Sequence, residues 1–358
     1  MPDNDSLLGF LTSVSGDQYV KVEENLGDGF VRLKISEAER RQAKHDIRSF
    51  EDIVVELLRN SRDAHARRIF VATSREGDLR HLTVVDDGVG VPTHLQEAIF
   101  QPRVTSKLET MVMDRWGVHG RGMALFSVRS NVQEARVVAS DSHRGLALAI
   151  VSDTTKLAER ADQSAWPTVE TGEDGRSKVA RGPHNIIRGV VEFALEHPEV
   201  DVYLGTPTEV VATLHSLAHA CLDTSQLMFC DDPGKLPVWQ RPAIAADADE
   251  LVAVATSIGL PVSERTAHRV LAGDLSALDR VAEMVIDAPE PAAPKSPDIY
   301  KDRRGIKLHH TDIAAFKREL EGAFDYIAER YYLQLKGEPR VTVDREGISV
   351  RFQVEKDD

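Results

Sequence analysis

Apolar and polar positions begin to alternate regularly near residue 49. From Ser49 to Ala66 the apolar residues recur at helical spacing, which predicts one helix over this range. Two short apolar runs follow, Ile69–Thr73 and Leu82–Val85, and each predicts a strand. Glu76-Gly77-Asp78 lies between them and has the composition of a turn. The pattern therefore predicts a helix that leads into a β-hairpin.

Further elements are predicted up to about residue 225. They are a helix and two strands within residues 123–152 (the strands at Ala135–Ser140 and Gly145–Ser152), a strand at Asn185–Val191 and a helix at Thr208–Leu222. Residues 153–181 are polar and rich in Gly, Ser and Asp, so we expect a long exposed loop there.

The rest of the chain separates into shorter parts. Ser263 is a candidate N-cap inside a helical region, and Thr311 is a candidate N-cap for a long amphipathic helix. A strand pair is predicted at Arg340–Val343 and Ile348–Val354. We predict five parts: an N-terminal segment at 1–48, a mixed α/β domain at 49–225, a helical unit at 246–287, a stiff proline-rich linker at 288–298 and a C-terminal helix with a β-hairpin at 299–358.

Composition narrows the class of protein. With 42% hydrophobic and 28% charged residues, the 358-residue chain can bury a core, and a disordered or collagen-like chain is excluded. The net charge of −14 excludes a generally basic nucleic-acid coat but leaves a local basic patch open. Two cysteines give no disulfide framework. No apolar run reaches the length of a membrane span, and the acidic N-terminus lacks a signal pattern, so we expect a cytoplasmic protein without a membrane partner.

Three polar residues share one face of the first predicted helix. Glu56, Asn60 and Asp63 fall within about 60° of one another at helical spacing. Carboxylate and amide oxygens suit Mg²⁺, and a glutamate one turn away can take a proton from water. An ordinary solvent-facing stripe would show the same residues, so the pattern alone leaves both interpretations open.

Two acids and two glycines follow the strand at Leu82–Val85. Asp86 at the strand end can accept a hydrogen bond from an exocyclic amine, and Gly88 and Gly90 allow a sharp turn and a close approach of a flat ring. A surface turn is the competing interpretation, because Asp-Gly pairs commonly form turns.

A glycine cluster precedes the helix predicted after residue 122. Gly117, Gly120 and Gly122 have the spacing of a loop whose backbone N–H groups approach phosphate. Thr105-Ser106-Lys107 lies upstream and adds two hydroxyls and a cation. Alone, such a cluster also fits a flexible loop.

The order and spacing of these three motifs resemble the ATP-binding fold shared by gyrase B subunits, histidine kinases, heat-shock chaperones and MutL, called GHKL or Bergerat. The resemblance covers roughly residues 50–215. It implies an α+β fold with a two-layer α/β sandwich, followed here by the small helical unit and the C-terminal helix and hairpin.

The resemblance also implies residue roles. Glu56 would be the catalytic base, Asn60 would hold Mg²⁺, and Asp86 would bind the adenine amino group between Gly88 and Gly90. Further residues implied to contact ATP are Asp63, Thr105, Ser106, Lys107, Gly117, Val118, His119, Gly120, Arg121, Gly122 and Met123.

Motif details favour particular branches of the family. The glutamate at position 56 resembles the hydrolysing branch, and Thr105-Ser106-Lys107 is similar to MutL-type proteins. The glycine cluster is similar to that of gyrase B and topoisomerase VI B subunits, and the helical unit resembles the helix-two-turn-helix of the latter. The resemblance implies an ATPase subunit of a DNA-processing machine, with DNA, a partner protein that supplies DNA cleavage, and an ATP-dependent homodimer.

Two alternatives stay open: a nucleotide-dependent chaperone or switch without a DNA role, and a protein kinase, which Glu56 disfavours. One departure affects the nucleotide pocket. Family members often have Gly-Thr before a late strand, whereas this chain has Gly182-Pro183, so the nucleotide pocket is expected to be either incomplete or differently built.

Overall fold

The protein contains two compact units, Met1–Ala288 and Pro289–Asp358, which are treated separately. The computed structural model describes residues 22–106, 122–172, 176–223, 230, 232–286, 308–344 and 347–356, and the backbone of 112–114 and 117–119. Within these ranges, no helix has the length and apolar character that crossing a membrane requires.

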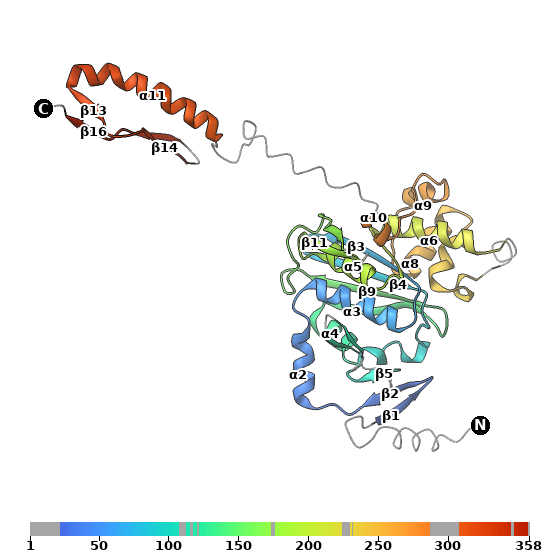
Figure 1. Ribbon diagram of the computed structural model, residues 1–358. Helices are drawn as coiled ribbons and strands as arrows, with labels where there is room; N and C mark the ends of the chain where they lie inside the picture. Colours follow the sequence, from blue (N-terminus) through green and yellow to red (C-terminus); the bar gives the residue numbers. More distant parts are fainter. Residues whose placement is uncertain are drawn as a thin grey trace. The chain divides into compact units, whose positions relative to one another are not determined.

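A five-stranded sheet forms the centre of the first unit (Figure 1). Its spatial order is β12-β3-β4-β9-β8, and the strands are β3 (Arg68–Glu76), β4 (Leu79–Asp86), β8 (Glu134–Ser140), β9 (Leu146–Asp153) and β12 (Asp201–Gly205). Only the β12–β3 pair is parallel. The predicted hairpin is confirmed, since Glu76 pairs with Leu79 across its turn.

Both faces of this sheet are buried. Ile69 and Val71 of β3 belong to one apolar cluster, whereas Phe70 and Ala72 belong to another, as the two-residue period of a strand requires. A strand buried on both faces has a continuous apolar run in place of an alternation, and Ile69–Thr73 has such a run. We call the face of Ile69 the inner face and that of Phe70 the outer face.

Helices cover the inner face. They are α3 (Phe50–Asp63), α4 (Ala124–Asn131) and α5 (Ile186–Glu196). The prediction of a strand at Asn185–Val191 was wrong. The Asn185 side chain accepts a hydrogen bond from the Arg188 N–H at 2.9 Å and caps α5. The helical period becomes visible only when the window extends to Phe193 and Ala194, which are buried.

A second group of helices covers the outer face and is clearly grouped in Figure 1. It comprises α6 (Pro207–Cys221), the short 3-10 helices η3 (Pro233–Lys235) and η4 (Val238–Ile244), α8 (Ala248–Ser257) and α9 (Glu264–Leu271). The aromatic ring of Phe70 stacks on Tyr203 with centroids 4.9 Å apart. The predicted α/β sandwich of sheet and inner-face helices is confirmed, and the outer-face helices add a further layer to the two that were predicted. Ser263 is confirmed as the N-cap of α9. Helices of the region 246–287 thus pack against the same sheet.

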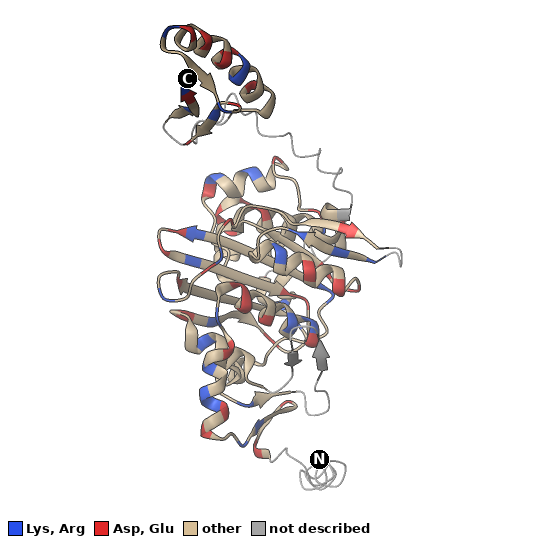
Figure 2. Ribbon diagram, turned by 60° about the vertical axis from the view of Figure 1, so that its left-hand side comes forward, with Lys and Arg blue, Asp and Glu red and all other residues tan. Residues whose placement is uncertain are grey.

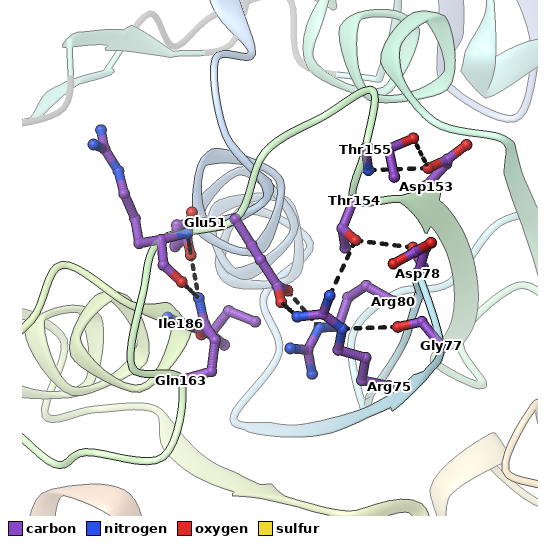
Figure 3. A network of polar contacts seen from close by, with 12 residues as sticks. Glu51, Arg75, Gly77, Asp78, Arg80, Asp153, Thr154, Thr155, Gln163 and Ile186 are labelled. Atoms are coloured by element: carbon purple, nitrogen blue, oxygen red, sulfur yellow. Dashed lines mark hydrogen bonds and ion pairs between the residues drawn. The ribbon is translucent and has the colours of Figure 1, made fainter.

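The segment 153–181 is more ordered than the exposed loop that was predicted. It contains a hairpin of β10 (Thr168–Thr171) and β11 (Ser177–Arg181). Its first half is held by hydrogen bonds: the Glu159 carboxylate accepts from Arg75 and from Arg80, the latter at 2.8 Å. Figure 3 shows a neighbouring contact, in which the Thr154 hydroxyl donates to the Asp78 carbonyl oxygen at 3.0 Å. The polar composition of the segment did not reveal these contacts. They join residues about 80 positions apart, which a local sequence pattern cannot show.

The N-terminal region also contains elements that its sequence did not reveal. They are β1 (Val22–Gly27), β2 (Phe30–Leu33) and α2 (Glu37–Asp46). Strand β2 pairs with β5 (Val104–Thr105), which carries one of the predicted site residues. The remaining short elements of this unit are η1 (Thr93–Leu95), η2 (Ala98–Phe100), β6 (Val112–Asp114), β7 (Gly117–His119) and α10 (Val281–Ile286).

The second unit consists of one long helix and two strand pairs. Its elements are α11 (His310–Tyr331), β13 (Leu333–Leu335), β14 (Arg340–Val343), β15 (Ile348–Arg351) and β16 (Val354–Lys356). The predicted N-cap Thr311 is wrong: the cap is His309, whose ring accepts from the Thr311 N–H. The predicted hairpin is confirmed as β14–β15, but its second strand ends at Arg351 because β16 pairs with β13. The proline-rich linker lies outside the described residues.

Charged residues lie mainly on helices and at strand ends (Figure 2). The central strands are mostly uncharged in the same view, as their double-sided burial requires.

Candidate functional site

A cavity of about 930 Å³ opens on the inner face. Its lining includes Glu56, Asn60 and Asp63 of α3, Asp86 at the end of β4, and Gly90. The volume is within the range of pockets that hold small ligands and cofactors, about 300–1,000 Å³. The structure thus brings together residues that were predicted from motifs about 30 positions apart.

Helix α3 presents its polar stripe because its other side is held by the sheet. Ile53, Leu57 and Leu58 are buried in the inner-face cluster. Glu56 and Asn60 are only partly buried and line the cavity. The interpretation as a plain solvent-facing stripe is therefore wrong, since the stripe lines the cavity.

Asn60 carries a polar atom that the described residues leave without a partner. Its Nδ2 atom is buried and makes no hydrogen bond within the part of the chain that the structure describes. A buried amide without a partner costs free energy, which a bound ligand can recover. Asn60 lines the cavity, where its N–H₂ group can donate to an oxygen of a bound phosphate and its side-chain oxygen is a ligand of the kind that Mg²⁺ takes.

Asp86 is the most deeply buried acid of the site, with an exposed fraction of 1%. It accepts hydrogen bonds from the Ser61 hydroxyl at 2.7 Å and from the Gly88 N–H at 3.0 Å. Burial is the main cause that raises its pKa to about 6, and these hydrogen bonds act in the opposite direction. Asp86 is thus a fixed acceptor at the cavity wall, ionised at neutral pH.

The glycines near Asp86 are required by close backbone contacts. A Cβ atom on Gly88 would lie 2.7 Å from the Ala64 carbonyl oxygen, and one on Gly90 would lie 2.1 Å from that of Asp141. Gly90 also has a φ of +68°. These contacts give a physical reason for the predicted role of the two glycines. Without a side chain at either position, the neighbouring loops can pack against the wall of the pocket.

The glycine cluster and the Thr105-Ser106-Lys107 segment before it are only partly described. Thr105, Ser106, Gly122 and Met123 line the cavity. Gly117, Val118 and His119 form β7, which pairs with β6, and only their backbone is described. Lys107, Gly120 and Arg121 lie outside the described residues, so their predicted contacts stay predictions.

Asp63 has a strong local partner. Its carboxylate accepts two hydrogen bonds from Arg62, at 2.8 and 3.0 Å, and Arg62 also lies 3.0 Å from the His197 ring. Burial, followed by the nearby Arg62 charge, lowers the pKa of His197. This arrangement ties α3 to the end of α5 and leaves the role of Asp63 toward a ligand as a prediction.

Gly182 and Pro183 do not belong to the cavity lining. The hydroxyl that supports Asp86 comes instead from Ser61, in the last turn of α3. The Ser61 position is visible in sequence, but only its distance to Asp86 reveals this contact.

Several lining residues escaped the sequence analysis. Arg59 is 3% exposed and forms an ion pair of 2.8 Å with Glu56. Phe30 comes from the N-terminal hairpin, and Arg160 and Arg188 come from segments more than 100 residues after Glu56. Only the i, i+3 spacing of Glu56 and Arg59 could have signalled one of these contacts. Among the described residues, no group of three or more His, Cys, Asp or Glu side chains could hold a metal ion.

Comparisons with known proteins identify the region around this cavity. Residues 45–179 match the family described as histidine kinase-, DNA gyrase B-, and HSP90-like ATPase. The chain is 32% identical over 160 residues to a DNA mismatch repair protein MutL of Thermus thermophilus, covering 43% of this chain and 28% of that protein. It is 28% identical over 191 residues to the MutL protein of Aquifex pyrophilus, covering 49% of this chain and 44% of that protein. The matched region is therefore less than half of each of these relatives.

Proposed function

We propose that the protein binds ATP with Mg²⁺ in the inner-face cavity and hydrolyses the nucleotide. The premise is that residues 45–179 form a domain of the histidine kinase-, DNA gyrase B-, and HSP90-like ATPase family. The observation that carries this proposal is the convergence of Glu56, Asn60 and Asp86 on one cavity. The residues come from a helix and a strand end, and their chemistry suits three parts of one ligand.

Each of these residues has a distinct task in the proposed reaction. Asp86 accepts a hydrogen bond from the adenine amino group and orients the base. Asn60 would hold Mg²⁺, and the ion would supply positive charge to the phosphates. Glu56 accepts a proton from the attacking water as its oxygen bonds to the terminal phosphorus and the bond to the ADP oxygen breaks. The products are ADP and phosphate, and the proton taken by Glu56 returns to solvent.

We further propose that the ATPase serves a DNA-processing assembly. The two relatives above are DNA mismatch repair proteins by name, and the family match at residues 45–179 includes the cavity residues Glu56, Asn60 and Asp86. In this proposal ATP closes the glycine-rich segment over the phosphates and favours a homodimer, while a partner protein performs chemistry on DNA. The N-terminal segment 1–48 is the candidate dimerisation arm, and its described part pairs with β5 beside the cavity.

One experiment separates this function from a nucleotide switch without a DNA role. ATP turnover is measured with and without double-stranded DNA, together with the mass in solution by light scattering with and without a non-hydrolysable ATP analogue. We expect DNA to stimulate turnover and the analogue to double the mass. Turnover that is indifferent to DNA would favour the switch, and phosphate transferred to a protein substrate would favour a kinase.

A further inference from the structure

The predicted base Glu56 is held by a buried cation on its own helix. Arg59 Nη1 donates to Glu56 Oε1 at 2.8 Å. The Arg59 side chain is only 4% exposed, whereas the Glu56 side chain is 23% exposed. Both side chains line the same cavity. The pair thus joins a cation enclosed by protein to a carboxylate that reaches the ligand space.

Arg59 cannot leave this position at low cost. Its guanidinium is always protonated, and a buried charge without a partner is strongly destabilising. The i, i+3 spacing keeps Glu56 and Arg59 on adjacent positions of one rigid helix.

We propose that Arg59 is a positioning residue for Glu56. The inference rests on the proposed ATP hydrolysis and extends it to a residue that no motif indicated. By donating to Oε1, Arg59 fixes the plane of the Glu56 carboxylate before ATP binds, so the carboxylate reaches the attacking water in one orientation. A base that is fixed in this way loses no rate to reorientation during the reaction.

The positive charge has a second effect that makes the pair measurable. A nearby arginine favours the ionised form of a carboxylate and typically lowers its pKa by about 1–3 when the pair is close. Removal of the charge therefore moves the titration of Glu56 to higher pH. This readout depends on the ion pair and requires neither ATP nor turnover.

The test uses Arg59→Met, Arg59→Lys and a matched control. Arg80→Met is the control, because Arg80 is also buried, has a side chain 9% exposed, and donates to Glu159 at the same distance of 2.8 Å away from the cavity. Each full-length variant is compared by thermal unfolding, ATP binding, steady-state turnover and carbon-13 NMR titration of glutamate carboxylates, with Glu56→Gln assigning the Glu56 signal.

We expect Arg59→Met to lower kcat by about 10- to 100-fold with little change in KM, and to move the Glu56 titration upward by about one pH unit or more. Arg59→Lys keeps the charge but not the planar geometry, so its titration stays close to that of the wild type and its kcat is intermediate. Arg80→Met keeps the wild-type kcat and Glu56 titration, whatever its effect on thermal unfolding.

A higher kcat in Arg59→Met would overturn the proposal, because Arg59 would then restrain the base. An unchanged Glu56 titration in Arg59→Met would also overturn it, because the ion pair would be absent in solution. If the wild type binds ATP but does not hydrolyse it under any condition, the proposed activity and the catalytic use of the pair both fail. The NMR titration would then still show whether Arg59 holds the carboxylate.

Discussion

The two faces of the central sheet are covered by helices in different ways. On the outer face, α6, α8 and α9 bury apolar side chains such as Leu251 and close the surface. On the inner face, α3 buries one side and turns Glu56 and Asn60 toward an open cavity. The same strands therefore support a closed core on one side and an open cavity on the other. The difference lies in whether the covering helix carries a polar stripe that faces inward.

The largest expected effect is a loss of ATP turnover, caused by a substitution on the inner face alone. Glu56→Ala should lower ATP turnover by about 10²–10⁴-fold, because a positioned general base contributes a factor of this size. ATP binding should persist, since Asp86 and Asn60 are unchanged. The measurement is steady-state phosphate release alongside equilibrium binding. Wild-type turnover in this variant would show that Glu56 is not the base.

A core substitution on the outer face should lower the stability of the protein without changing its affinity for ATP. Leu251 is fully buried in α8, and Leu251→Ala should lower the free energy of unfolding by about 2–5 kcal/mol. Its dissociation constant for an ATP analogue should match that of the wild type at a temperature where both are folded. Leu58→Ala is the matched variant, because Leu58 is equally buried but supports the polar stripe of α3. If both variants weakened binding equally, the two faces would not be functionally distinct.

Asp86→Asn should separate binding from folding. The substitution replaces a charged acceptor with an amide whose N–H₂ group faces the adenine amine, and a hydrogen bond to a charged group contributes about 1.5–3 kcal/mol. Affinity for ATP should therefore fall by roughly 10- to 150-fold, measured by equilibrium dialysis. The unfolding temperature of the nucleotide-free variant should be no lower than that of the wild type, because the substitution removes a buried charge. A lower unfolding temperature with unchanged affinity would indicate a purely structural Asp86.

The smallest expected effect is a pH dependence from the same carboxylate. Burial raises the pKa of Asp86 to about 6, and the adenine contact requires its ionised form. ATP affinity should thus fall by about tenfold between pH 7 and pH 5. Asp86→Asn should show a shallower dependence, and it controls for protonation of ATP itself. A profile that Asp86→Asn leaves unchanged would assign the pH effect to the ligand.

Stability of the nucleotide-free protein should respond to pH with the opposite sign. The pKa of Asp86 is higher in the folded protein than its ordinary value of 3.8. This group therefore opposes folding above about pH 6, and the opposition fades as the pH falls toward 4. Thermal unfolding of the wild type relative to Asp86→Asn should show this trend, which isolates the contribution of Asp86.

Local patterns predicted the elements of the site well. Helix α3 and the β3–β4 hairpin were visible because their apolar spacing is long and regular, and the order of Glu56, Asn60 and Asp86 indicated the ATP-binding fold. Helix α5 was mistaken for a strand because Ile186–Val191 is rich in β-branched residues and spans fewer than two helical turns.

Contacts between distant segments could not be predicted in the same way. The Ser61–Asp86 hydrogen bond joins residues 25 positions apart, and β2 pairs with β5 across about 70 residues. The outer-face helices gave no sign of their packing partner, because amphipathic helices fit any apolar surface. Sequence thus indicated candidate side chains for the chemistry, whereas only the structure shows that Glu56, Asn60 and Asp86 share one cavity.

The central claim is that the inner-face cavity is an ATP site. Titration calorimetry of the wild-type protein with a non-hydrolysable ATP analogue and Mg²⁺ tests it most directly. We predict saturable binding of one analogue per chain that Asp86→Asn weakens and Leu251→Ala leaves intact. Absence of binding at millimolar analogue, in a sample shown to be folded by its thermal unfolding transition, would contradict the claim.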